Sequence, residues 1–137
     1  MNDLSLQEIH APQGHCFGCG VTNSHGLQIK SFSEGDKLVA RWEGCDRFEA
    51  FPGILNGGII GALLDCHSNW AAAYHLLERD NLESLPTTVT AEYGVRLHRG
   101  TPSNKQVELR AWVENSSGSK VHVKAELLAD GEVCATC

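Results

Sequence analysis

The sequence predicts an α+β protein in which an antiparallel β-sheet wraps around one long central helix. The first observation is an alternation of apolar and polar residues, typical of strands, which occurs twice before residue 43 and repeatedly after residue 88. The second is the stretch from Gly58 to about Leu77, where apolar or small residues cover most of the helical circumference. Such a helix is enclosed by other elements, and the antiparallel meander that follows it can enclose it.

The first two strands are predicted to form a hairpin. Residues 27–32 alternate between apolar and polar, and residues 38–42 do so again after a turn at 33–36. Residues 1–25 are rich in turn formers and are predicted to be irregular. The remainder, 26–137, is expected to be a single domain, because a chain of 137 residues is long enough to bury one core.

The helix is predicted to follow a loop at 43–57 and to end where charges return at Glu78-Arg79-Asp80. Further strands are then expected over residues 89–98, 107–113 and 121–127, with a last short one starting near Val133. The breaks at 100–102 and 115–118 are typical of hairpin turns.

The composition excludes several classes of function. The formal net charge is −6, which argues against a general nucleic-acid surface. No apolar run approaches the ~18 residues of a transmembrane helix, and the first residues lack the basic and apolar regions of a signal peptide. We therefore expect a cytoplasmic protein that binds neither nucleic acid nor membrane, with its 6 cysteines as reduced thiols.

The start of the helix carries the strongest functional signal in the residues themselves. Gly57 and Gly58 open the helix, where unpaired backbone N–H groups and a partial positive charge suit an anion or a polarised carbonyl. Asp65 follows among apolar residues, where an unpaired carboxylate is costly to bury. Backbone donors together with a carboxylate indicate a small site for acyl transfer or hydrolysis.

Three groups of residues occur in the order and spacing of a known family. They are Cys19-Gly20, Asn23 and Gly26-Leu27 near the start, Asn56-Gly57-Gly58 and Leu63-Leu64-Asp65 at the helix, and Thr90, Val95, Leu97 and Arg99 on a later strand. From about residue 13 onward the chain resembles the hotdog-fold acyl-CoA thioesterases, specifically the PaaI-like group. Two positions depart from that family, because its turn histidine is Asn56 here and the proline after its arginine is Gly100.

The resemblance implies catalytic roles for several residues. Asp65 is the carboxylate, which acts either as a general base on water or as a nucleophile on the thioester. Gly57 and Gly58 offer backbone N–H groups to the thioester carbonyl. Asn56 either holds that carbonyl or caps the helix, and it cannot exchange a proton as histidine does. Thr90 matches a hydroxyl residue that faces the site across a dimer interface, although threonine is equally a good β-former.

A second set of residues is expected to bind the substrate. Arg99 carries the family's arginine and is expected to contact a phosphate of coenzyme A. Gly61 lies one turn before Asp65, and Ser68 and Asn69 lie one turn after it. Together they predict a small, polar edge of the helix that leaves room for a substrate.

No metal or other cofactor is expected. Cys16 and Cys19 have the C-x-x-C spacing of half a zinc site, and His15 and His25 are two candidates for further ligands. Without a second cysteine pair this spacing is weak evidence. His67, among apolar helix residues, is expected to be a core or interface histidine whose hydrogen bonds are satisfied.

Hydrolysis of an acyl-CoA thioester to free CoA and a carboxylic acid is the function that the sequence favours. The resemblance implies a homodimer with sites at its interface, often paired again into a homotetramer. The alternative is a non-catalytic acyl-CoA binding or regulatory domain, which Asn56 in place of histidine supports. Hydration or dehydration of an acyl thioester is a weaker third hypothesis, since only His67 or His98 is placed to assist the carboxylate.

Overall fold

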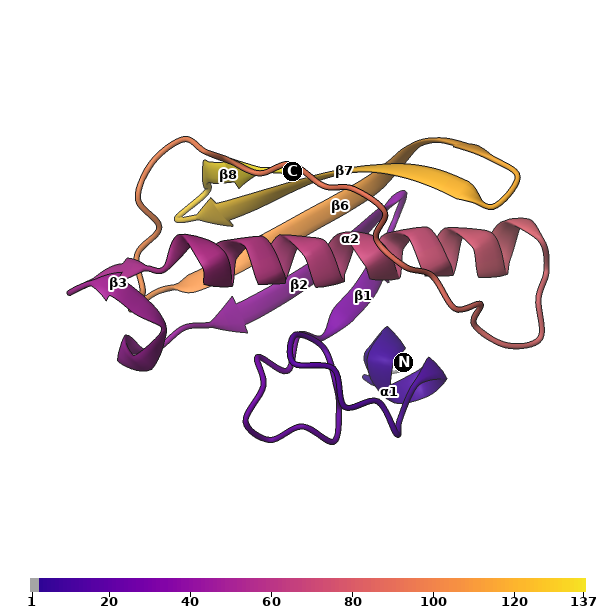
Figure 1. Cartoon of the computed structure of the whole chain (residues 1–137), viewed down its shortest axis with the longest axis horizontal. Coiled ribbons are helices and arrows are strands. Elements are labelled where there is room, and N and C mark those ends of the chain that lie inside the picture. Colours follow the sequence, from indigo (N-terminus) through magenta and orange to yellow (C-terminus); the bar gives the residue numbers. More distant parts are fainter. Residues whose placement is uncertain (1–2) are drawn as a thin grey trace.

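The computed structural model describes residues 3–137 and places one long helix against a six-stranded β-sheet (Figure 1). The strand order is β1-β2-β6-β7-β8-β5, and every neighbouring pair is antiparallel. The strands are β1 Ser31–Glu34, β2 Lys37–Glu43, β5 Arg96–Leu97, β6 Gln106–Ser117, β7 Lys120–Ala129 and β8 Glu132–Thr136. With the long helix α2 Gly57–Arg79, this arrangement confirms the predicted fold class.

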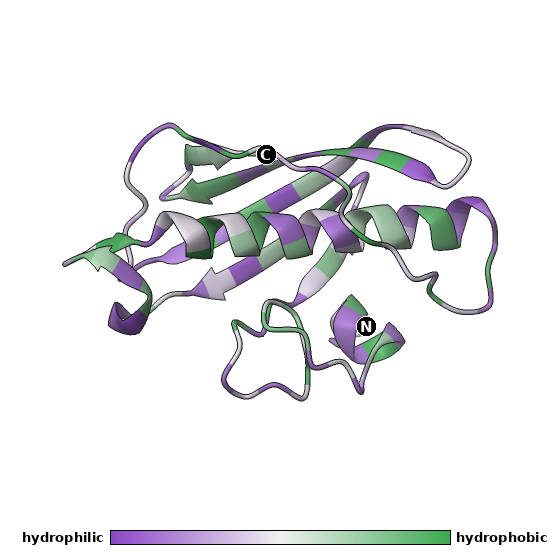
Figure 2. Cartoon of the chain, viewed as in Figure 1, coloured by the Kyte–Doolittle hydropathy of each residue, from purple (hydrophilic) through white to green (hydrophobic). Residues whose placement is uncertain are grey.

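Helix α2 packs on the sheet because most of its surface is apolar. It starts behind Asn56 and ends at Asp80, where the return of charged residues predicted its end. Leu63 and Leu64 are both fully buried, although adjacent residues point about 100° apart on a helix. Figure 2 shows apolar residues along α2 and along the strands behind it. The helix is therefore covered on more than one side, as its sequence indicated.

The central hairpin of the sheet, β6-β7, supplies the opposite wall of the core. Val107, Leu109 and Ala111 are fully buried and alternate with the partly exposed Glu108 and Arg110. This period of two directs one face of β6 toward α2 and the other toward solvent. The predicted meander of strands after residue 106 is confirmed.

The N-terminal segment differs from the irregular structure predicted for residues 1–25. Leu6–His10 forms the short helix α1, which starts with a capping box between Ser5 and Glu8. Leu6 is buried in the same core as α2. The turn-forming residues lie mainly after this helix. The capping box and the burial of Leu6 stabilise the short helix that precedes them.

The predicted strand at 27–32 becomes a sheet strand only at Ser31. Leu27 and Ile29 are buried as their alternation predicted, but their N–H groups donate to the carbonyls of Phe17 (2.8 Å) and Gly18 (3.1 Å). Alternation reports which side chains are buried and does not identify the partner of the backbone. The first part of this segment therefore pairs with the N-terminal loop rather than with the sheet.

The segment predicted as a strand at 89–98 is also different, because only β5 Arg96–Leu97 pairs with the sheet. Residues 88–95 lie beside α2 without a regular backbone partner among residues 3–137, and Val89 is 84% exposed. In Figure 1 the chain leaves the end of α2, crosses the helix and reaches β8.

The loop predicted at 43–57 holds a 3-10 turn at Asp46–Phe48 and a small hairpin, β3 Glu49–Phe51 and β4 Ile54–Leu55. Among the described residues, no helix is both long enough and apolar enough to cross a bilayer.

A chain of buried polar groups connects α1, β1 and α2. The Nε2–H of His67 donates to the carbonyl of Leu38 (2.9 Å), so Nδ1 of the neutral ring accepts from the hydroxyl of Ser31 (2.8 Å). Gln7 Nε2 donates to Ser31 Oγ (3.0 Å), and Gln7 Oε1 accepts from the Ser31 N–H (2.8 Å). Burial lowers the pKa of His67 to about 4. Of the two surroundings predicted for His67, core or interface, the structure of this chain shows the core, with both ring nitrogens hydrogen-bonded.

Candidate active site

Asp65 and Thr90 meet although they come from different elements. Asp65 is half-buried on α2, and the hydroxyl of Thr90 donates a hydrogen bond of 2.6 Å to its Oδ1. Asn69, one turn further along α2, donates from Nδ2 to Thr90 Oγ1 and to the carbonyl of Thr88, both at 3.3 Å. The hydroxyl of Thr88 in turn donates to Asn69 Oδ1. Three of the predicted site residues therefore form one hydrogen-bonded group.

The hydroxyl of Thr90 contacts Asp65 of its own chain. The expectation that Thr90 also faces a site across a dimer interface stays a prediction. Thr88 was not predicted at all. The sequence does indicate that Thr88 lies on the same side as Thr90, because residues i and i+2 share a face in extended backbone.

Asp65 has no neutralising cation. Among residues 3–137 it forms no ion pair, and the bond from Thr90 is the one hydrogen bond to its carboxylate. A hydroxyl that donates to Oδ1 leaves the other carboxylate oxygen free to accept from water or to attack an electrophile. This arrangement suits a general base or nucleophile better than a structural ion pair does.

The start of α2 is capped by a side chain. Asn56 Oδ1 accepts hydrogen bonds from the N–H groups of Gly58 (2.8 Å) and Ile59 (3.2 Å). Of the two roles considered for Asn56, the structure shows the cap. The N–H of Gly58 is consequently engaged, whereas that of Gly57 has no partner among the described residues. A Cβ on Gly57 would lie 3.2 Å from Leu97 Cδ1, so glycine permits this close approach.

Replacing Asn56 with alanine is expected to lower the free energy of unfolding by about 1 kcal/mol, because two N–H groups of the first turn lose their acceptor. Urea denaturation of the purified variant measures this loss. Asn56→Asp is the matched control, since a carboxylate oxygen caps as well and complements the helix dipole. An alanine variant as stable as the wild type would contradict the importance of this cap.

The donors at the helix start and the carboxylate of Asp65 are separated within one chain. Asp65 lies eight positions after Gly57 in the helix, which corresponds to about 12 Å along the axis. A single thioester carbonyl cannot contact both. The donors and the carboxylate that the sequence predicted to act together are therefore not brought to one point within a single chain.

The other residues predicted to bind the substrate differ in burial and in their contacts. Gly61 is buried, and a Cβ there would lie 3.9 Å from the hydroxyl of Tyr93, a residue that sequence reasoning missed. The hydroxyl of Ser68 is buried and has no hydrogen-bond partner among the described residues. Arg99 is exposed and forms an ion pair with Glu132. The polar edge of α2 is thus present, while Arg99 lies outside it.

A cavity of about 440 Å³ lies beside the C-terminal half of α2, under β1, β2 and β6. Ala71, Tyr74 and His75 line it from the helix. Ala71 is six residues beyond Asp65, which places it about 120° around the helix from that carboxylate. The cavity therefore belongs to a different face of α2 from the candidate active site.

Next to Asp65, Cys66 approaches the two cysteines of the N-terminal loop. The sulfur atoms of Cys16, Cys19 and Cys66 all lie within 4.8 Å of one another. Hydrogen bonds from Cys66 and Trp70 lower the pKa of Cys19 to about 6, against the effect of burial. The bond that Cys66 donates to Cys19, together with burial, raises the pKa of Cys66. The C-x-x-C spacing predicted the proximity of the first two thiols but not of the third, because 46 residues separate Cys19 from Cys66.

This chain is similar to several solved structures. No family model matches this chain, and no curated protein sequence matches it significantly. A thioesterase superfamily protein from Shewanella loihica is 28% identical with a TM-score of 0.66, over 83% of this chain and 89% of that one. A phenylacetic acid degradation-related protein from Ralstonia eutropha is 23% identical with a TM-score of 0.65, over 80% of each chain. Zebra fish thioesterase superfamily member 2 is 18% identical with a TM-score of 0.67, over 83% of each chain.

Proposed function

The chain has the hotdog fold of the thioesterase superfamily, and from this premise we propose that it hydrolyses an acyl-CoA thioester to free CoA and a carboxylic acid. The observation that carries the proposal is the carboxylate of Asp65, which is half-buried, oriented by Thr90 and paired with no cation. Such a group costs free energy to bury without a partner, and a reactive role accounts for that cost.

In the proposed reaction, Asp65 takes a proton from a water molecule as that water attacks the thioester carbonyl carbon. The tetrahedral intermediate then expels the sulfur of CoA, which takes up the proton, and the carboxylic acid remains. The alternative course is direct attack by Asp65 on the thioester carbon, which breaks the C–S bond, expels CoA as its thiolate and leaves an anhydride. Water then hydrolyses the anhydride, which releases the carboxylic acid and regenerates the Asp65 carboxylate, and the thiolate takes up the proton that this water loses. In both courses Thr90 holds one carboxylate oxygen, so that the other points at the reacting atoms.

The proposed site is completed by a second copy of the chain. The distance of about 12 Å between Gly57 and Asp65 means that a carbonyl at Asp65 receives its N–H donor from the helix start of a partner. Three large apolar side chains support such an interface, since Val89, Tyr93 and Leu97 are 84%, 52% and 53% exposed beside the candidate active site. β5 is also the edge strand of the sheet, and among the described residues no strand pairs with its outer side. We propose a homodimer, and a dimer of dimers where two such units pair again.

The proposed substrate contains coenzyme A, which carries several phosphate charges. Arg99 is proposed to contact one of these phosphates after exchanging its exposed ion pair with Glu132. Such surface pairs contribute little to stability, so this exchange costs little. A cytoplasmic location is part of the proposal, because all six cysteines are free thiols.

A non-catalytic acyl-CoA binding domain is the second candidate. Asn56 favours it, because this side chain caps the helix and cannot exchange a proton. Hydration chemistry has less support, since His67 is bonded within the core and His98 Nε2 lies 2.8 Å from Thr136 Oγ1. Neither histidine contacts Asp65.

A panel of aromatic, short-chain and long-chain acyl-CoA thioesters distinguishes the two candidates. We expect release of free CoA, followed with a thiol reagent, for at least one member of the panel. Saturable binding of the thioesters without turnover of any of them would favour the binding domain instead. Size-exclusion chromatography with light scattering tests the homodimer in the same samples.

Thr90→Val is expected to lower kcat by roughly ten- to a hundredfold, because a hydrogen bond to a charged group is lost without a change of shape. KM should change much less, since Thr90 is proposed to hold Asp65 rather than the substrate. Thr90→Ser keeps the hydroxyl and is the matched control. Equal kcat values for the valine and serine variants would show that Thr90 does not position Asp65.

A further inference from the structure

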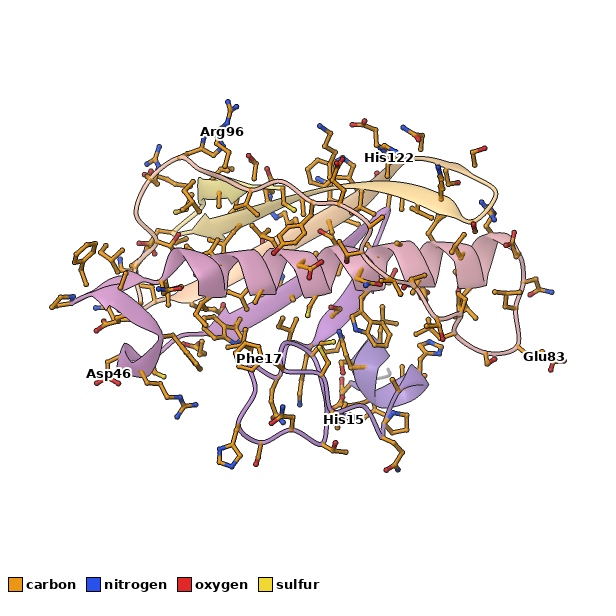
Figure 3. The ribbon with its side chains drawn as sticks, in the orientation of Figure 1. His15, Phe17, Asp46, Glu83, Arg96 and His122 are labelled. Atoms are coloured by element: carbon orange, nitrogen blue, oxygen red, sulfur yellow. The ribbon has the colours of Figure 1, made fainter. Side chains whose placement is uncertain are left out.

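The three-thiol cluster at the N-terminal loop is a feature that the proposed hydrolysis does not use. Cys16 and Cys19 come from the loop after α1, and Cys66 comes from the middle of α2. In the view of Figure 3, the labelled His15 and Phe17 mark this loop on one side of α2, while β7 and β8 lie on the other. The fold thus brings Cys66 to two neighbouring loop cysteines that are far from it in sequence.

The spacing of the sulfur atoms fits a zinc ion. Ligand sulfurs about 2.3 Å from a tetrahedral zinc lie about 3.8 Å apart. Sγ of Cys16 and Sγ of Cys66 are 3.8 Å apart, and the third sulfur lies within 4.8 Å of both. A disulfide requires about 2 Å, so the cysteines are not bonded to one another, and their spacing is compatible with ligands around a common centre.

Groups around the cluster are arranged to support thiolate ligands. The N–H of Gly18 donates to Cys16 Sγ (3.4 Å), and Nε1–H of Trp70 donates to Cys19 Sγ (3.3 Å). Such second-layer N–H donors orient ligands and stabilise their charge in metal sites. A Cβ on Gly18 would lie 2.3 Å from Cys66 Sγ, so glycine is what allows the loop to lie against the helix.

We propose that Cys16, Cys19 and Cys66 bind one Zn²⁺ ion per chain. Thiolates select zinc over the hard cations, and a chain with free cysteines is suited to hold it. His15 and His25 do not join the cluster, so among residues 3–137 no side chain supplies a fourth ligand. Cys16 is exposed, so solvent reaches the cluster and can supply the fourth ligand. The ion joins the N-terminal loop to α2 beside Asp65, and its role is to hold these two elements together.

Metal titration of the reduced, metal-free protein tests this proposal without any measurement of turnover. Co²⁺ should bind one equivalent per chain with a sulfur-to-cobalt charge-transfer absorption, and Zn²⁺ should displace it. Each of the variants Cys16→Ser, Cys19→Ser and Cys66→Ser is expected to weaken Zn²⁺ binding on the order of a hundredfold or more, since loss of a supporting group alone costs 10–100-fold. Trp70→Phe should weaken it by about tenfold. Cys45→Ser, outside the cluster, is the control and should bind as the wild type does.

Thermal unfolding provides a second readout. At a free Zn²⁺ concentration of about 100 Kd, the Tm should rise by roughly 5–10 °C in the wild type and not in Cys66→Ser. If Cys66→Ser fails to fold, Cys16→Ser decides the matter, because Cys16 is exposed. The proposal is overturned if the wild type takes up no Co²⁺ with thiolate absorption, or if Cys16→Ser binds Zn²⁺ as tightly as Cys45→Ser. Absence of acyl-CoA turnover would overturn the proposed hydrolysis and leave this result unaffected.

Discussion

Asp65→Asn is expected to lower kcat/KM for the acyl-CoA substrate by about 10²–10⁴-fold. Asparagine keeps an oxygen that accepts the hydrogen bond from Thr90, so the local structure is retained. The amide cannot take a proton from water, and it cannot form an anhydride. The loss should therefore appear in kcat more than in KM. Steady-state kinetics with the best substrate of the panel measures it.

The matched control is Glu83→Gln, which neutralises an exposed carboxylate beyond the end of α2. This variant should retain wild-type kinetics. Circular dichroism and thermal unfolding of Asp65→Asn should match the wild type, which separates loss of chemistry from loss of fold. An Asp65→Asn protein that is folded and fully active would remove the carboxylate from the mechanism.

The stability of the protein is expected to fall by about 3 kcal/mol between neutral pH and pH 4, through His67 alone. Burial lowers the pKa of His67 to about 4 in the folded state, against 6.5 for an ordinary histidine. Above pH 6.5 the ring is neutral in both states, and this stability is fully present. As the pH falls from 6.5 towards 4, the unfolded chain binds a proton that the folded chain excludes, so the free energy of unfolding decreases. Below about pH 4 both states bind the proton, and no further loss arises from this residue.

Urea denaturation at a series of pH values measures this dependence. His67→Gln offers a donor to Leu38 and an acceptor to Ser31, so it should fold with a lower stability at pH 7 and a much flatter profile between pH 6.5 and 4. His122→Gln removes an exposed histidine of β7 and should keep the wild-type slope. Equal slopes in both variants would place the acid sensitivity elsewhere.

The candidate active site was predicted from the sequence to different degrees. Asp65 stood out because a carboxylate among apolar helix residues violates the local pattern. The structure shows that Thr90 donates a hydrogen bond to it, while the catalytic roles of both residues stay predictions. The role of Asn56 stayed open, since the same amide can cap a helix or hold a ligand, and only the bonds to Gly58 and Ile59 show the cap. The family motif predicted that Arg99 binds the substrate, but a motif cannot show that Arg99 forms an ion pair with Glu132.

The sequence by itself determined the elements whose signal is local. The apolar circumference of α2, the alternation in β6 and β7, and the charges that end α2 at Asp80 each act over a few neighbouring residues. The tertiary structure alone decided which distant groups meet. Alternation at residues 89–95 did not produce a sheet strand, because pairing depends on a backbone partner that this chain does not provide. Cys66 joins Cys16 and Cys19 for the same reason, since side chains far apart in sequence come together only through packing of the whole chain.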